Sequence, residues 1–265
     1  MLSQIRKFFL LFFISFIFFF KSLLGDVAFI TNQESNMLDI IDLTQKKNIK
    51  QIKVGEKPAG IAIDKINKIV FVSNPESNNI SKIDLEKNIH EFFFAGNSPM
   101  SLYYAHQNKL LYVTNWYENK ISVVNTLNNK LIKSIDVGKS PAGIFVAEDL
   151  KRIFVANKDD NTVSVVDTDD FKILKNIHVG KAPYGVFSSS KTEYIFITNV
   201  QSHSVTLINK KTLKIEKEIK VGKWPYQIAY NKRKQIIYVT NQRDNSISVI
   251  DLKVKKVIKT MSDIC

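Results

Sequence analysis

The sequence is poor in the residue types that most often carry catalysis or bind metals. Its 265 residues include one cysteine, Cys265, and four histidines, so an intramolecular disulfide is excluded and soft metal ligands are few. It contains no nucleophile elbow, zinc-protease helix, P-loop, haem-attachment motif or dinucleotide-binding glycine pattern. We therefore predict no catalytic residues, no cofactor and no metal site.

A short phrase recurs six times along the chain and dominates its organisation. Each copy consists of an aromatic residue, a branched apolar residue, a small residue and a closing asparagine. In the copy at 111–115 (LYVTN) a leucine precedes the aromatic residue. The closing asparagines lie 41 or 42 residues apart, at Asn32, Asn74, Asn115, Asn157, Asn199 and Asn241. A period this regular predicts a repeat architecture.

One repeat unit reads as four β-strands. Apolar or alternating runs at 143–147, 152–157, 162–167 and 172–179 are separated by polar turns. A four-stranded antiparallel sheet repeated every 42 residues fits blades arranged around a channel, because neighbouring blades cover each other's apolar faces. We therefore predict an all-β fold, a β-propeller of about six four-stranded blades.

Fixed polar positions support this register. Asn or His follows each closing asparagine by four residues, and Asp or Asn follows it by ten. Such side chains bond nearby backbone N–H groups and tolerate a positive φ, so we predict turn residues at both places.

The first unit lacks its first strand, because the repeats begin at 27–32 and the count is 23 strands. Three outcomes follow: a six-bladed ring with one thin blade, an open ring completed by a partner chain, or a shortened relative of a longer propeller. We expect six blades with imperfect closure. An unpaired strand edge invites pairing, so a partner or a homo-oligomer through the incomplete blade stays an alternative.

Residues 1–25 are predicted to be a targeting segment, and 26–265 the propeller. Arg6 and Lys7 precede a run of 13 residues, Phe8 to Phe20, that is apolar except for Ser15, suits a signal-peptide core and is short for a membrane span. We expect a periplasmic or secreted protein. The alternative is anchoring by residues 5–24, in which case the membrane is touched only through this uncleaved segment.

The repeated motifs resemble the YVTN family of β-propeller repeats over roughly 27–262. The resemblance rests on the aromatic-to-asparagine phrase, on 247–251 (ISVID) and on the recurring V-G-x-x-P-x-G pattern. It implies a secreted or periplasmic protein, such as a surface-layer-type protein, that serves as a binding or scaffold module. The family brings no shared catalytic residues.

Charge and topology together suggest a binding face. The formal net charge is +13, which favours anionic partners. The crossings between blades and the loops between second and third strands are expected on one face of the disc. They carry the predicted ligand-binding residues, namely Lys57, Lys139, Lys181, Lys223, Arg243, Trp116, Tyr117, Tyr184, Trp224 and Tyr226, with Lys158 beside them. Cations among aromatics suit single-stranded nucleic acid or an acidic glycan, and exposed aromatics also suit a protein partner. The alternative is that the lysines recur only because the unit recurs and that the aromatics pack on the prolines.

Three functions compete on this evidence. The leading hypothesis is a non-enzymatic binding or scaffold propeller exported to the bacterial cell envelope. The second is an enzyme or cofactor carrier, lactonase-like or quinone-binding, with polar groups converging on the channel. The third is a structural surface-layer component. His90, His106, His178 and His203 occupy four different positions of the repeat, which argues against a histidine-ringed metal centre.

Overall fold

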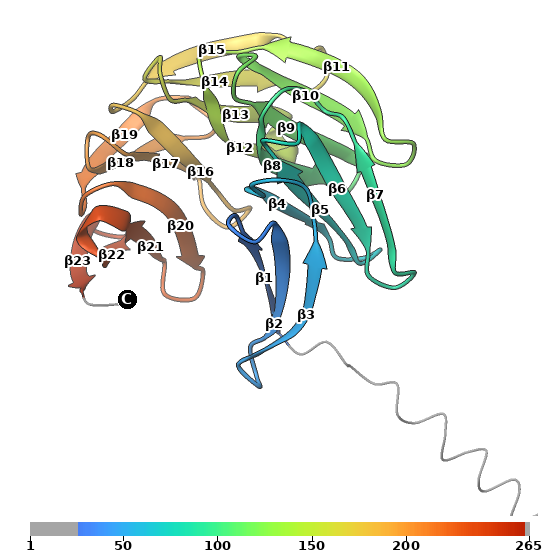
Figure 1. The fold of residues 1–265 in the computed structure, drawn as a ribbon. Coiled ribbons are helices and arrows are strands. Elements are labelled where there is room, and N and C mark those ends of the chain that lie inside the picture. Colours follow the sequence, from blue (N-terminus) through green and yellow to red (C-terminus); the bar gives the residue numbers. More distant parts are fainter. Residues whose placement is uncertain (1–25, 263–265) are drawn as a thin grey trace, which may run out of the picture.

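The computed structural model describes residues 26–262, and these form six β-sheets arranged as blades around a central axis (Figure 1). All strands pair with their chain neighbours in antiparallel fashion, and the fold is the predicted all-β propeller. Five blades have four strands and the first has three. The predicted targeting segment and Cys265 lie outside the described residues.

The first three blades hold eleven strands. Blade 1 consists of β1 (Val27–Asn32), β2 (Met37–Asp42) and β3 (Lys47–Lys53). Blade 2 consists of β4 (Ile61–Asp64), β5 (Ile69–Asn74), β6 (Asn79–Asp84) and β7 (Ile89–Phe93). Blade 3 consists of β8 (Pro99–Ala105), β9 (Leu110–Asn115), β10 (Lys120–Asn125) and β11 (Lys130–Asp136).

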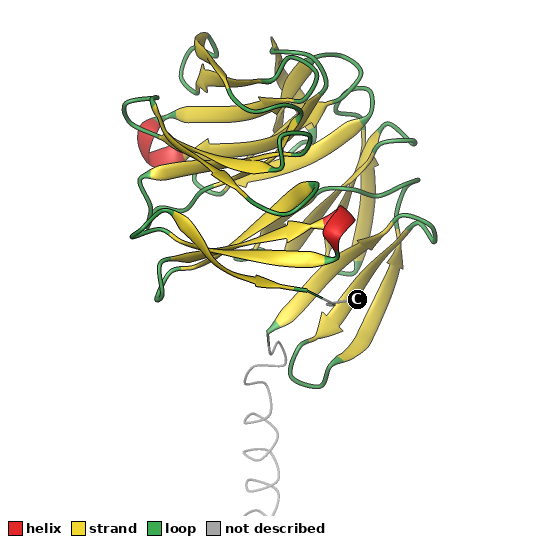
Figure 2. Cartoon of the chain, turned by 90° about the vertical axis from the view of Figure 1, so that its left-hand side faces the viewer, coloured by secondary structure: helices red, strands yellow, loops and turns green. Residues whose placement is uncertain are grey.

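The last three blades hold twelve strands and two short 3-10 turns, η1 (Glu148–Leu150) and η2 (Gln242–Asp244), seen in Figure 2. Blade 4 consists of β12 (Pro141–Ala147), β13 (Arg152–Asn157), β14 (Thr162–Asp167) and β15 (Ile173–His178). Blade 5 consists of β16 (Pro183–Phe187), β17 (Tyr194–Asn199), β18 (Ser204–Asn209) and β19 (Ile215–Lys220). Blade 6 consists of β20 (Pro225–Asn231), β21 (Ile236–Asn241), β22 (Ser246–Asp251) and β23 (Lys256–Met261).

The predicted turn residues take the predicted roles. Positive φ angles, between 45° and 58°, occur at Asn36, Asn78, Asn119, Asn161, His203 and Asn245. The side chains at the other repeated position accept backbone hydrogen bonds that close the next turn, for example at Asp42 and Asp84. Local side-chain chemistry therefore sets where each strand ends.

The hydrophobic core lies in the seams between blades. Each of the five core clusters joins two consecutive blades, from the cluster of Leu38 with Val70 between blades 1 and 2 to that of Leu207 with Val239 between blades 5 and 6. Alternate side chains of one strand face opposite neighbours, so every blade depends on the next for burial.

The ring is open between blade 6 and blade 1 (Figure 1). In the other blades the innermost strand, called strand a below, is β4, β8, β12, β16 or β20, whereas blade 1 begins with its second strand. Within residues 26–262 no helix has the length and apolar character needed to cross a membrane.

Candidate functional site

The crossings between blades and the loops between second and third strands lie on one face, as predicted, and are called the rim. Hydrogen bonds tie them together. The Lys57 backbone N–H donates to Asn36 Oδ1 at 2.9 Å, and the Lys139 N–H donates to Asp160 Oδ2 at 2.7 Å. The rim therefore consists of crossings and loops that are joined by hydrogen bonds between them.

Aromatic side chains from three blades meet at the rim. The rings of Trp116 and Tyr184 lie 6.3 Å apart, and those of Tyr184 and Tyr226 lie 4.9 Å apart with an edge-to-face angle of 75°. Burial, together with the neighbouring Tyr226, raises the pKa of Tyr184. Trp224 stands apart from this group and lies under Arg243, at 5.0 Å. Three of the five predicted aromatics thus form one cluster, Trp224 pairs with Arg243, and Tyr117 is exposed.

The predicted lysines of the rim are exposed, but they do not share one repeated position. Lys139, Lys181 and Lys223 stand two residues before the proline of their crossing, whereas Lys57 stands one before it. The φ of Lys57 is 52°, in register with Ser98, Ser140, Ala182 and Trp224. Lys57, Trp116 and Tyr117 line one cavity of about 800 Å³ that extends over blades 1 to 3, and the other three lysines are not part of its lining.

The rim carries no surplus of positive charge. Its cations are Lys57, Lys139, Lys158, Lys181, Lys223 and Arg243, and its carboxylates are Glu34, Glu56, Glu76, Glu118, Asp159, Asp160 and Asp244. Several of these carboxylates hold the turns: Asp159 accepts from Ser140 Oγ at 2.5 Å and lies 2.8 Å from Lys158 Nζ. An anion approaching the rim meets both signs of charge, so the basic character of the chain resides elsewhere.

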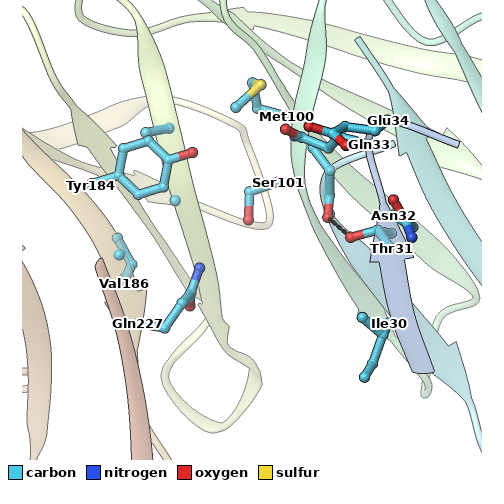
Figure 3. A pocket seen from close by; sticks show the side chains of 15 residues that line it. Ile30, Thr31, Asn32, Gln33, Glu34, Met100, Ser101, Tyr184, Val186 and Gln227 are labelled. Atoms are coloured by element: carbon cyan, nitrogen blue, oxygen red, sulfur yellow. Dashed lines mark hydrogen bonds between the residues drawn. The ribbon is translucent and has the colours of Figure 1, made fainter. Parts of the chain in front are cut away.

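The central channel opens into a cavity of about 610 Å³ (Figure 3). Blades 2 to 6 line it with residues in or just before strand a, mostly small ones such as Gly60, Ser101 and Gly143. Blade 1 contributes β1 itself and the loop after it, including Gln33 and Glu34. Glu34 is the one carboxylate of this lining, and Ser101, Tyr184 and Gln227 bring polar side chains to it from three other blades.

The surplus of cations lies on the opposite face, in four loops of blades 5 and 6. We call residues 188–193, 210–214, 232–235 and 252–255 the lysine face. Its cations are Lys191, Lys210, Lys211, Lys214, Lys232, Arg233, Lys234, Lys253 and Lys255, and its one carboxylate is Glu193. The net charge of the whole chain does not reveal this face. It becomes visible when charges are counted separately for the equivalent loops of each repeat.

A cavity of about 690 Å³ is hollowed between these loops. Lys210, Lys211, Lys253 and Lys255 line it together with Asp149 of blade 4. The Lys210 side chain is 6% exposed, and its Nζ lies 3.7 Å from Asp149 Oδ2 and 3.4 Å from the Ser189 carbonyl oxygen. Lys255 Nζ lies 4.9 Å from the Tyr194 ring. This arrangement sets cations beside an aromatic ring in a recess.

A buried carboxylate on the same side of blade 2 is structural. Asp64, 2% exposed, accepts from Tyr104 Oη at 2.7 Å and from Asn67 Nδ2 at 2.6 Å. Burial by itself raises the pKa of Asp64, but these hydrogen bonds outweigh it and lower the pKa to about 2. A carboxylate so fully bonded closes the turn after β4 and is a poor proton carrier at neutral pH.

Metal ligands do not gather anywhere in residues 26–262: no three His, Cys, Asp or Glu side chains there are grouped as an ion would require. The histidines are dispersed, as the repeat register predicts. The rings of His90 and Phe92 lie 4.3 Å apart at a tilt of 39° in blade 2, and His203 accepts the Trp224 backbone N–H at 3.3 Å in blade 5.

The fold is shared with several solved structures of low sequence identity. Hydrazine synthase of Kuenenia stuttgartiensis is 18% identical, with a TM-score of 0.77 over 86% of this chain and 74% of that one. A functionally unknown protein of Desulfotomaculum acetoxidans is 14% identical, with a TM-score of 0.76 over 89% and 82%. Dihydro-heme d1 dehydrogenase NirN, solved in complex with DHE, is 12% identical, with a TM-score of 0.71 over 90% and 55%.

These likenesses establish the fold alone, and a search of curated proteins finds no match. The family model of the YNCE-like β-propeller matches residues 62–152 and 145–262, which is most of the chain. This agrees with the YVTN-type repeats, the six sheets and the conserved spacing of strand, turn and crossing within the chain itself. The chain belongs to the YncE-like β-propeller family.

Proposed function

We propose that this protein is a non-enzymatic binding module of the cell envelope, and that its lysine face binds an acidic polymer. One observation carries the proposal: nine cations against one carboxylate in four adjoining loops. Tyr194 lies beside Lys255, and Tyr230 and Tyr238 line a cavity with Lys232 and Arg233. Cations attract a polyanion at long range, and aromatic rings add stacking contacts.

Export is the second part of the proposal and rests on the sequence of residues 1–25. The basic start followed by the apolar run Phe8 to Phe20 is typical of a signal peptide or N-terminal anchor. Fractionation of cells that make the tagged chain tests this point, and recovery in the cytoplasm would contradict it.

The test measures binding of the full chain, kept in a mild detergent, to two probes at several salt concentrations. The probes are fluorescein-labelled single-stranded DNA and fluorescein-labelled hyaluronate. If about four phosphates are neutralised, we expect DNA affinity to fall about 50-fold between 50 and 200 mM salt. The triple variant Lys191→Glu, Lys211→Glu, Lys253→Glu should lose binding. The matched rim variant Lys139→Glu, Lys181→Glu, Lys223→Glu should keep it, and the reverse outcome would assign the polymer to the rim. Binding to neither probe would reject the lysine face.

The rim supports a second candidate function, contact with a protein partner. Trp116, Tyr184 and Tyr226 form a packed cluster flanked by paired charges of both signs. Aromatic anchors surrounded by a polar border are typical of protein interfaces rather than of polyanion sites. A rim variant that abolishes partner capture while leaving DNA binding intact would support two separate surfaces.

A further inference from the structure

The edge of β1 that faces the open side of the ring has no neighbouring strand within residues 26–262. Thr31 stands where Ser73 stands in blade 2. The Ser73 N–H donates to the Gly60 carbonyl oxygen at 3.0 Å, and the Ser73 carbonyl oxygen accepts from the Ala59 N–H at 2.9 Å. Backbone groups of alternate β1 residues, Phe29 and Thr31, therefore point to an empty strand position.

In blades 2, 3 and 5 a hydroxyl relay links strand a of the blade to strand a of the next blade. The hydroxyl of Ser73 accepts from the Gly60 N–H at 2.8 Å and donates to the Met100 carbonyl oxygen at 2.6 Å. The same two bonds occur at Thr114, to Ser101 at 2.9 Å and Ala142 at 2.7 Å, and at Thr198, to Gly185 at 2.8 Å and Tyr226 at 3.0 Å.

The two residues that flank the opening hold complementary halves of this relay. Thr31 Oγ1 donates to the Ala59 carbonyl oxygen at 3.1 Å, but the described residues offer it no strand-a N–H. Thr240 Oγ1 accepts from the Gln227 N–H at 3.1 Å, but finds no strand-a carbonyl among them. One extended strand would supply the N–H to Thr31 and the carbonyl oxygen to Thr240.

Side-chain exposure marks the same vacancy from both sides. Ile30 is 46% exposed, whereas its equivalents Val72, Val113, Val155, Ile197 and Val239 are fully buried. Thr240 is exposed, whereas Ser73, Thr114 and Thr198 are fully buried. Figure 3 shows Ile30, Thr31 and Asn32 across the cavity from Tyr184, Val186 and Gln227.

We propose that this opening receives one extended strand from another protein, which pairs with β1 and becomes strand a of blade 1. Addition of a strand to a free sheet edge is an established mode of peptide recognition, with backbone bonds giving affinity and side-chain pockets giving specificity. This inference goes beyond polymer binding and does not depend on it.

The chain itself shows which sequence fits. Four of its five a-strand segments begin Pro-x-[Gly/Ser] followed by a branched or leucine residue, as in Pro58 to Ile61. A Cβ added to Gly60, Gly143 or Gly185 would lie 2.2 to 2.4 Å from a carbonyl oxygen of the next blade, so a small residue is required there. Blade 6 carries Gln227 at this position, and its side-chain amide lies in the cavity as a further donor for the incoming strand.

The chain's own residues are unsuited to this position. All a-strands of residues 26–262 are already paired within their blades, so a second copy has none to give. Phe16 and Phe18 lie 42 residues, one repeat, before Pro58 and Gly60, so they would occupy the positions of this proline and this glycine in blade 1. A phenylalanine there would meet the Ala59 carbonyl oxygen, which argues against residues 1–25 as the occupant, and we assign the position to a strand of a different protein.

The test uses the full chain in a mild detergent and a fluorescein-labelled peptide with the sequence of Lys57 to Lys65 (KPAGIAIDK). We expect saturable binding by anisotropy and slower hydrogen exchange at the amides of Phe29 and Thr31. The same peptide with Gly60→Phe should bind about tenfold more weakly or not at all. The protein variant Thr240→Val should weaken binding about fivefold. Thr260→Val, an exposed threonine on the outer strand of the same blade, should leave it unchanged.

Three results would overturn the proposal. The first is no saturable binding of the peptide at about 1 mM, and the second is equal binding of the peptide and its Gly60→Phe form. The third is full exchange protection of Phe29 and Thr31 in the chain without peptide, because the edge would then be covered by the chain itself.

Discussion

Thr114 Oγ1 donates a hydrogen bond of 2.7 Å to the carbonyl oxygen of Ala142, and so joins the second strand of blade 3 to the first strand of blade 4. Thr114 is fully buried and Ala142 is 2% exposed. The bond crosses the seam between blades at its inner end, where side chains are too short to contribute much apolar contact. The small residue of the repeated phrase is thus a link between blades.

Blade 4 lacks this link, because Ala156 stands where the other blades have serine or threonine. We predict that Ala156→Ser stabilises the protein by about 1 kcal/mol, since the new hydroxyl reaches both the Gly143 N–H and the Tyr184 carbonyl oxygen. Thermal unfolding should show a rise of about 2–4 °C. Thr114→Val removes the corresponding pair of bonds and should lower the midpoint, and a fall for both variants would contradict the relay.

The closing asparagine of each repeat should matter for stability most where it is buried and its amide has hydroxyl partners. Asn157 is fully buried and its Nδ2 donates to Thr162 and Ser164 at 3.0 and 2.8 Å, whereas Asn32 is exposed. We predict a loss of about 2 kcal/mol for Asn157→Ala and less than about 0.5 kcal/mol for Asn32→Ala, measured by denaturant unfolding. Equal losses would mean that burial of the asparagine and these two bonds contribute nothing to stability.

Asp64 should make stability depend on acidity below pH 4. Its pKa in the folded chain, about 2, lies below the ordinary value of 3.8, so its contribution is full above pH 4 and is lost as the pH falls through 2. We predict that Asp64→Asn costs roughly 2 kcal/mol at neutral pH and that the difference shrinks toward pH 2. Asp136→Asn, a carboxylate 89% exposed, is the control and should change little. A constant deficit at every pH would contradict the prediction.

Tryptophan emission should report which face a ligand occupies. The chain has two tryptophans, Trp116 and Trp224, and both lie on the rim, beside Lys158 at 5.4 Å and Arg243 at 5.0 Å. We predict that saturating single-stranded DNA leaves the emission maximum and acrylamide quenching unchanged, because the lysine face is on the other side of the disc. A shift on DNA binding that disappears in Trp116→Phe would place the DNA on the rim.

Strand positions were predictable because the signals that set them are local. In blade 4 the predicted runs 152–157 and 162–167 coincide with β13 and β14, and the other two differ from β12 and β15 by two residues or fewer at each end. The positive φ at Asn161 and the backbone bonds accepted by Asp167 follow from side-chain chemistry within a few residues. Because the same motifs recur in every repeat, the strands predicted for one repeat could be assigned to the other repeats as well.

The candidate site was less predictable, because it depends on which side chains share a surface. Sequence reasoning brought Trp116, Tyr184 and Tyr226 to one face correctly, since topology alone sends those loops there. It did not anticipate that Asp159, Asp160 and Asp244 would stand beside the rim lysines and balance them. Nor did it single out the lysine face, whose loops are separated by about 20 residues each in the chain.

The sequence by itself determined the all-β fold, the six sheets and the missing first strand of blade 1, because strand alternation and turn chemistry are properties of neighbouring residues. Tertiary structure alone decided where charge accumulates and that Thr31 and Thr240 face one vacant strand position. The physical reason is distance along the chain. These two threonines lie at opposite ends of the sequence, and only the arrangement of the blades around the axis brings their hydroxyls, each with half of the relay, to the same opening.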